Sequence, residues 1–270
     1  MFMWRNGERV EIEAYCKDRK EPTPNQHKIL LEEVGGRCPM PGCGKSLVNE
    51  IDGKIYNQYE IAHVFPNSPD DFQRLHLEDV EVDGDDSESL DNKIALCHDC
   101  HTKYDDNTTA VSYGMMLDLK RRLAVELKAK KEISKELIEE DVVKVISVLS
   151  GMKKEDLQGS EELAYKSLKV SQKVEDYTLC MDIENRVTKY FNFVKECFKR
   201  FDPNGDRFEL ICVTVKKVYL KLKTQGLNQN EMFDMITDWF VAKTHGTKVA
   251  CEIMTSFFVQ NCDIYDEISK

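Results

Sequence analysis

The sequence has no apolar run that approaches a membrane span, which takes about 18 or more consecutive apolar residues. Its first residues, Met1 to Arg9, carry charges where an export signal would have an apolar stretch. We therefore expect a soluble, cytoplasmic protein that does not bind membranes. Thiols stay reduced in the cytoplasm, so the ten cysteines are expected to be metal ligands and buried apolar groups, not disulfides.

Proline is nearly absent from the C-terminal part of the chain, where Pro203 is the only one left. Apolar residues such as Val187, Tyr190 and Val194 recur there at three- and four-residue steps, which places them on one helix face. The pattern predicts helices near residues 114–131, 134–150, 159–180, 183–201, 207–225, 229–244 and 247–259. Residues 36–110 are rich in turn-forming proline and glycine. We expect three parts: a small domain over 1–113, a helical connector over 114–154 and a helical domain over 155–270.

Positive charge is scarce in the first of these parts. Residues 1–113 contain 12 Lys and Arg against 23 Asp and Glu, a difference that equals the net charge of −11 of the whole chain. Eight of these acids lie within residues 78–91, a stretch that has no Lys or Arg. Such a charge balance disfavours tight, unaided binding of duplex DNA. We interpret the acidic stretch as a solvated loop, with an acidic flap over a DNA site as the alternative.

Four cysteines have the spacing of metal ligands. Cys38 and Cys43 form one short knuckle, and Cys97 and Cys100 form a second. Two such knuckles can present four thiolates to one zinc ion in a closed tetrahedral site. A structural zinc of this kind supplies on the order of 10 kcal/mol of binding energy, which also stabilises the fold. The remaining cysteines, on helical faces, fit buried thiols.

Histidines and an asparagine stand between and after the knuckles. His63 follows a predicted strand, Asn92 precedes the second knuckle, and His101 comes directly after it. Asp105 lies four residues after His101, so both side chains can share a helix face and hold a divalent ion.

These residues resemble the HNH endonucleases over about residues 36–107. The resemblance implies an α+β protein, in which a small zinc-stapled ββα-metal nuclease domain precedes a mostly α-helical domain. It implies metal-dependent hydrolysis of DNA phosphodiester bonds, with His63 as general base and Asn92 fixing the loop that aims it. His101 and Asp105 would hold a catalytic divalent ion, which could be Mg²⁺, Mn²⁺, Ni²⁺ or Zn²⁺.

The sequence departs from many family members immediately before His63, where Ala62 replaces a further metal ligand. Glu60 is an additional candidate ligand, although strand alternation would put it on the opposite face from His63. We interpret His98 as a solvated turn residue. Lys93, Lys103 and residues 120–122 could contact DNA phosphates without reading sequence, or could simply be solvated.

The end of the chain, Ala250 to Tyr265, resembles the C-terminal domain shared by effectors of bacterial ABC three-component defence systems, the group that includes Lamassu. This second resemblance spans about residues 155–268. It implies an anti-phage complex with an SMC-like ATPase and a small third component, and possible homo-oligomers. An aromatic pair such as Phe257 and Phe258 is also consistent with an ordinary core.

Two functions remain open. The chain is either a nuclease effector that acts on DNA with little sequence specificity, or a zinc-stabilised adaptor whose nuclease site is vestigial. We favour the enzyme, because a scaffold has no use for His63, Asn92, His101 and Asp105 together. A stand-alone homing or restriction nuclease would be expected to carry a basic, base-reading module, and none is evident in the sequence.

Overall fold

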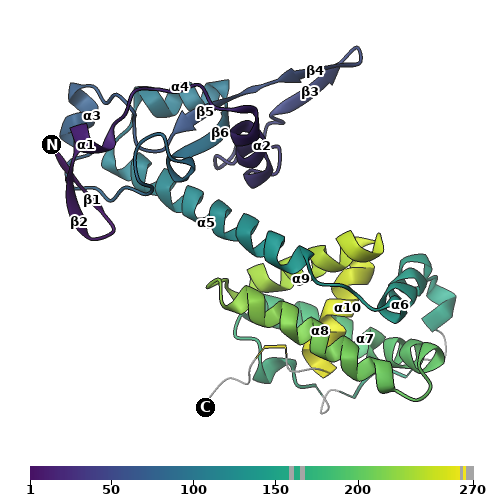
Figure 1. Ribbon diagram of the computed structural model, residues 1–270. Helices are drawn as coiled ribbons and strands as arrows, with labels where there is room; N and C mark the ends of the chain where they lie inside the picture. Colours follow the sequence, from purple (N-terminus) through teal and green to yellow (C-terminus); the bar gives the residue numbers. More distant parts are fainter. Residues whose placement is uncertain (158–160, 165–167, 262–263, 266–270) are drawn as a thin grey trace. The chain divides into compact units, whose positions relative to one another are not determined.

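The computed structural model describes residues 1–157, 161–164, 168–261 and 264–265 (Figure 1). It divides into two compact units, Met1–Lys128 and Ala129–Lys270. The boundary falls within helix α5, which runs from Ala110 to Ser134. The first unit mixes short strands with helices, and the second is built of helices, so the predicted α+β class with a small mixed domain before a helical one is confirmed. The three-part division at residues 113 and 154 stays a prediction.

Three antiparallel strand pairs and four short helices precede α5 in the first unit. The strands are β1 (Phe2–Arg5), β2 (Glu8–Glu11), β3 (Val48–Ile51), β4 (Lys54–Asn57), β5 (Tyr59–His63) and β6 (Lys93–Cys97). The helices are α1 (Ile12–Tyr15), α2 (Pro24–Glu33), α3 (Asp71–His76) and α4 (His98–Asp106), and a short 3-10 turn, η1, covers Leu90–Asn92. Two hairpins close through Asn6-Gly7 and Asp52-Gly53, whose positive φ angles match the two-residue turns that such pairs favour.

The ββα unit consists of β5, β6 and α4. In the register of β5 with β6, Tyr59 faces Cys97 and His63 faces Lys93. The second knuckle therefore lies at one end of this strand pair and His63 at the other. All five residues of β6 are buried, and α4 follows β6 directly because Cys97 is its N-cap residue. This arrangement brings the start of α4, with His101, back beside β5.

Helix α5 packs on the first unit through its N-terminal half. Tyr113, Met116 and Leu117 are buried in the same apolar core as the strands β5 and β6. Lys120 is also buried, and its ammonium group lies 2.6 and 2.7 Å from the two carboxylate oxygens of Glu33 on α2. The ion pair fixes α5 against α2.

The second unit packs its helices around an aromatic core. Its elements are α6 (Glu140–Gly151), η2 (Lys154–Leu157), η4 (Val170–Gln172), α7 (Tyr177–Phe201), α8 (Asp206–Lys223), α9 (Gln229–Thr244) and α10 (Lys248–Asn261). Phe257 of α10 stacks on Phe191 of α7 at 5.0 Å, and Phe258 lies 6.0 Å from Phe240 of α9. Both Phe257 and Phe258 are buried, so the aromatic pair near the end of the chain belongs to the core. Cys262 and Asp263, within the C-terminal motif, lie outside the described residues.

The helix predicted over residues 159–180 is wrong for residues 161–164 and 168–176, whereas residues 177–180 are helical as the first turn of α7; residues 159–160 and 165–167 lie outside the described part of the chain. Residues 161–164 have no regular structure, and residues 168–176 contain only the turn η4 before α7 starts. The side chain of Asp176 accepts a hydrogen bond from the Leu179 backbone N–H, which sets the start of α7 at Tyr177. The buried Lys173 donates to the Val259 carbonyl, so this segment is held by tertiary contacts instead of by a helix.

None of the described helices combines the length and the apolar character that crossing a membrane requires.

Candidate active site

The four knuckle cysteines come together in the first unit. One sulfur from each of Cys38, Cys43, Cys97 and Cys100 lies within 4.8 Å of the other three, and the Cys43 and Cys97 sulfurs are 3.7 Å apart. A tetrahedral zinc with Zn–S bonds of about 2.3 Å would hold its sulfurs about 3.8 Å from one another. The spacing fits that ion. Burial raises the pKa of the Cys38 and Cys100 thiols, whereas a backbone hydrogen bond at Lys45 lowers the pKa of Cys43 to about 7, so Cys43 is the one of these three that most readily forms the thiolate a metal needs.

His63 lies at the end of β5 with its ring half-buried. Its Nε2 atom is 2.9 Å from Oε1 of Glu88, and Oε2 of the same carboxylate is 2.7 Å from the ammonium group of Lys93. Burial lowers the pKa of His63, and the hydrogen bond to Glu88 offsets this only in part. The imidazole is therefore neutral near pH 7 and can accept a proton.

Asn92 is buried and connects the two segments that flank His63. Its side-chain oxygen accepts the backbone N–H of Phe65 at 2.7 Å. Its amide group donates to the carbonyl oxygens of Phe65 and Ser87, at 3.0 and 2.9 Å. These bonds hold the chain just after His63 against the chain just before Glu88.

His101 stands between two carboxylates. Its Nε2 lies 3.1 Å from Asp105, one turn further along α4, and its Nδ1 lies 2.5 Å from Glu60 on β5. The hydrogen bond with Asp105 raises the pKa of His101, burial opposes this, and the bond with Glu60 adds to the increase. Glu60 also contacts His98 at 3.2 Å; His98 is exposed, as expected, but it begins α4 and does not lie in a turn.

His63, His101 and Asp105 line one cavity of about 200 Å³. Arg19, Pro66, Asn67, Ser68 and Gln73 complete its wall. Water takes about 30 Å³ per molecule in the liquid, so the cavity has room for a phosphodiester group and a few waters. The guanidinium of Arg19 forms no ion pair with any residue in the described ranges. Sequence reasoning missed both Arg19 and Glu88, because neither belongs to a spaced motif.

Several basic residues that the sequence offered for phosphate contacts are engaged elsewhere. Lys93 is buried against Glu88, and Lys120 is buried against Glu33, so both are unavailable to DNA. The guanidinium of Arg121 binds Asp83 at 2.7 Å and Glu81 at 3.1 Å. Both alternatives that the sequence left open for Lys120, a phosphate contact or a solvated helix face, are therefore wrong, because burial against a carboxylate satisfies its charge within the protein. Lys103 and Arg122 remain exposed.

The acidic stretch 78–91 is not a freely solvated loop. Val82 and Ser87 are buried, and the Tyr15 hydroxyl donates to the Asp83 carbonyl. The Glu88 side chain is only 7% exposed. The interpretation as a solvated loop is wrong for these residues because apolar and hydrogen-bonding contacts hold the stretch to the core. The alternative, that the stretch acts as an acidic flap over a DNA site, stays a prediction.

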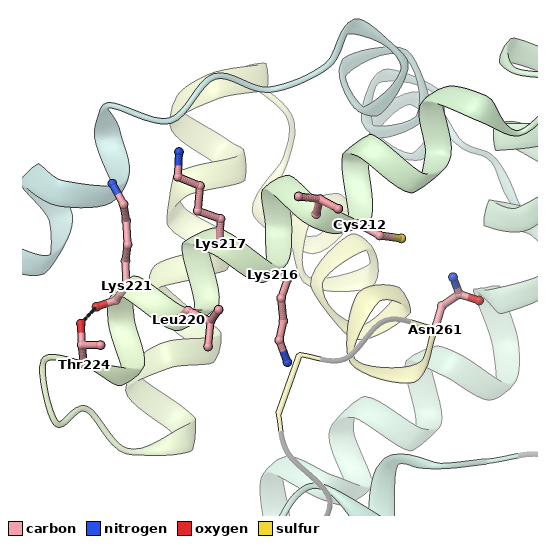
Figure 2. A pocket seen from close by; sticks show the side chains of 8 residues that line it. Cys212, Lys216, Lys217, Leu220, Lys221, Thr224 and Asn261 are labelled. Carbon is pink, nitrogen blue, oxygen red and sulfur yellow. Dashed lines mark hydrogen bonds between the residues drawn. The ribbon is translucent and has the colours of Figure 1, made fainter.

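A larger hollow lies in the second unit along α8 (Figure 2). It has a volume of about 740 Å³ and is lined by Cys212, Val213, Lys216, Lys217, Leu220, Lys221, Thr224 and Asn261. Lys217 and Lys221 point the same way in Figure 2, and both ammonium groups bind Glu136, at 2.8 and 2.6 Å. The lining described here includes no carboxylate and no histidine, so it lacks the groups that phosphodiester hydrolysis uses.

Two family models match the chain. Residues 43–112 match the HNH endonuclease family, and residues 129–265 match C-terminal domain 11 of the ABC-three component (ABC-3C) systems. No curated protein and no solved structure matches it. Both resemblances inferred from the sequence are confirmed. The second match starts where the second structural unit starts, and it includes α6, which the sequence analysis assigned to a connector.

Proposed function

The chain belongs to the family of C-terminal domain 11 of the ABC-three component systems, and we propose that it is the nuclease effector of such a system. Its HNH domain would hydrolyse DNA phosphodiester bonds with the help of a divalent ion. The observation that carries this proposal is that His63 and the pair His101–Asp105, from β5 and α4, line the same cavity.

The donor set of His101 and Asp105 fits a hard divalent ion. Two neighbouring ligands of an octahedral ion with bonds of about 2.1 Å are about 3.0 Å apart. The distance between His101 Nε2 and Asp105 Oδ2 is 3.1 Å. A bound divalent ion supplies charge stabilisation for the phosphate and the departing oxygen. Mg²⁺ and Mn²⁺ suit the carboxylate, and Ni²⁺ and Zn²⁺ suit the imidazole.

Glu60 has a different role in this proposal from that of Asp105. The two carboxylates contact opposite nitrogens of the His101 ring. Glu60 therefore orients the imidazole through Nδ1, whereas Nε2 and Asp105 face the cation. Carboxylates commonly fix metal-binding histidines in this way.

The remaining side chains bind and activate the reactants. His63 accepts the proton of the attacking water in its neutral form. Asn92 fixes the backbone that follows His63, through the bonds to Phe65. Arg19, which lines the cavity beside His63, contacts the phosphate, because a guanidinium fork matches phosphate oxygens. The four cysteines hold a structural Zn²⁺ that fixes the far end of β6.

The second unit would connect this nuclease to its complex. We assign to residues 129–265 the binding of an SMC-like ATPase and a small third component, and possible self-assembly, in an anti-phage defence system of the Lamassu kind. Recruitment by partners also suits the acidic first unit, which would have little affinity for DNA alone.

Cleavage of supercoiled plasmid tests the proposal. The wild type, His63→Ala and the control His76→Ala would be compared with Mg²⁺, Mn²⁺, Ni²⁺ and Zn²⁺, with and without the ATPase partner. His76 is exposed and lies outside the cavity. We expect His63→Ala alone to lose activity, by about 10²–10⁴-fold.

A zinc-stabilised adaptor with a vestigial site is the alternative. It would take the place of the nuclease if the wild type and His63→Ala behaved alike with every metal, both alone and with the partner present. Retained assembly with the ATPase would then locate the function in the second unit.

A further inference from the structure

Glu88 is the most deeply engaged carboxylate beside the candidate active site. Its side chain is 7% exposed, and its two oxygens bind different partners. Oε1 meets His63 Nε2 at 2.9 Å, and Oε2 meets the Lys93 ammonium group at 2.7 Å and the backbone N–H of Lys20 at 3.2 Å. The Lys93 side chain is only 2% exposed. The carboxylate is therefore locked in place between the imidazole and a buried cation.

We propose that Glu88 is a positioning residue for the general base, holding the His63 ring with Nε2–H on its carboxylate so that Nδ1 is the proton acceptor. The inference rests on the proposed nuclease function. It gives Glu88 a specific role, although the sequence alone does not distinguish Glu88 from the other seven acids of the stretch 78–91.

The hydrogen-bond chemistry fixes the direction of this contact. An ionised carboxylate can only accept hydrogen bonds, so the imidazole must donate to it. Burial disfavours the charge of Glu88, but the bonds from Lys93 and His63 outweigh this, and its pKa is lowered. With Nε2 protonated, the neutral ring keeps its lone pair on Nδ1. His63 lines the cavity and Glu88 does not, so the ring edge away from Glu88 is the one that reaches the reactants.

Lys93 supplies the positive charge that allows the buried Glu88 carboxylate to stay ionised. A carboxylate with so little exposure needs a compensating charge, and the strand register puts Lys93 directly opposite His63. The charged groups that act on His63 are thus Glu88, Lys93 and the more distant Arg19. Glu88 raises the pKa of His63, whereas the two cations lower it.

The test uses three variants of the full chain. Glu88→Gln/Lys93→Met removes both members of the ion pair, so no buried charge is left without a partner. Glu88→Asp keeps a carboxylate on a shorter side chain, with Lys93 intact. Glu78→Gln is the matched control, since Glu78 is an exposed acid of the same stretch. Thermal unfolding checks that each variant is folded.

Two readouts separate positioning from a structural role. The first is the tautomer of His63, read from long-range ¹H–¹⁵N spectra of the six histidines, which needs no activity. We expect Nε2–H in the wild type, Glu88→Asp and Glu78→Gln, and a mixture of tautomers in the double variant. The second is plasmid cleavage as a function of pH. We expect the double variant to lose about 100-fold in rate. Its acidic limb should move to lower pH, because the two effects of Glu88 that raise the His63 pKa are larger than the effect of Lys93 that lowers it, and both residues are removed.

The outcomes are distinct from those of the nuclease test. A wild-type protein with Nδ1–H on His63 overturns the inference, whatever its activity. So does a double variant that keeps the Nε2–H tautomer, or one that cleaves at the wild-type rate with an unshifted acidic limb. If the wild type shows the expected tautomer but cleaves no DNA under any condition, the nuclease function fails and the placement of His63 by Glu88 stands as a structural fact only.

Discussion

Asn92→Ala is expected to release the loop after His63 while leaving α4 in place. Asn92 is 2% exposed and satisfies three backbone groups, the N–H and carbonyl of Phe65 and the carbonyl of Ser87. Each buried polar group left without a partner costs about 1–3 kcal/mol. Even at the lower limit the three together cost about 3 kcal/mol, a large fraction of the 5–15 kcal/mol by which a typical protein is stable.

Two neighbouring amides provide an internal comparison for this variant. The Phe65 N–H binds the Asn92 side chain, whereas the Val64 N–H binds the Asn92 backbone carbonyl at 2.8 Å, which alanine retains. Native-state hydrogen exchange should therefore accelerate at Phe65 by roughly 5- to 150-fold, which corresponds to the 1–3 kcal/mol lost there, and much less at Val64. Asn57→Ala, at an exposed position of β4, serves as the control.

Asn92→Ala should change the loop after His63 but not the metal ligands on α4. Cleavage should fall because His63 loses its fixed position, while binding of Mn²⁺ at His101 and Asp105 on α4 should change little. Equal exchange rates at Phe65 in the variant and the wild type would refute the reasoning. So would a loss of Mn²⁺ binding as large as the loss of cleavage, since it would show that the variant disturbs the whole ββα unit.

Three further predictions concern stability. Lys120→Met alone should destabilise the first unit by about 3–5 kcal/mol in urea unfolding, because it removes the buried ammonium group that faces the Glu33 carboxylate, whereas Lys120→Met/Glu33→Leu should recover most of the loss; a double variant as unstable as the single one would contradict this. Cys100→Ser should lower the zinc content of the protein, and hydrogen exchange measured at increasing temperature should show the first unit unfolding before the second. Cys180→Ser should have neither effect. Lys217 and Lys221 of α8 lower the pKa of Glu136. The Glu136 carboxylate therefore stabilises the folded protein above its ordinary pKa, and this stabilisation is lost as the pH falls through the lowered pKa. The difference in the free energy of unfolding between the wild type and Glu136→Gln should be present at pH 7 and shrink toward pH 4.

The sequence was most informative where chemistry requires fixed spacing. Each cysteine knuckle is local, so the pairing of Cys38 with Cys43 and of Cys97 with Cys100 could be read without knowing the fold. The spacing of His101 and Asp105 likewise depends only on helix geometry. The structure brings all six side chains into these predicted groups.

Contacts between distant segments could not be read in the same way. Glu88 is one of eight acids in residues 78–91, and nothing local distinguishes it from Glu78. Its partner Lys93 stands opposite His63 only through the register of β5 with β6. The helix predicted over residues 159–180 failed for a related reason, because contacts such as that of Lys173 with Val259 override a local helical pattern.

The ion pairs of the first unit limit the number of its cations that could bind DNA. Lys93, Lys120 and Arg121 each bind carboxylates of the same unit. Residues 1–128 carry 16 Lys and Arg against 25 Asp and Glu, and ion pairing within the unit leaves this net charge of −9 unchanged. Non-specific affinity for DNA arises from cations that neutralise phosphates. Apart from Arg19 in the cavity, few cations near His63 are free to do so. We therefore predict that the proposed binding of DNA by this unit depends on the divalent ion and on cations of a partner, so that its salt dependence is steeper in the complex than in the isolated chain.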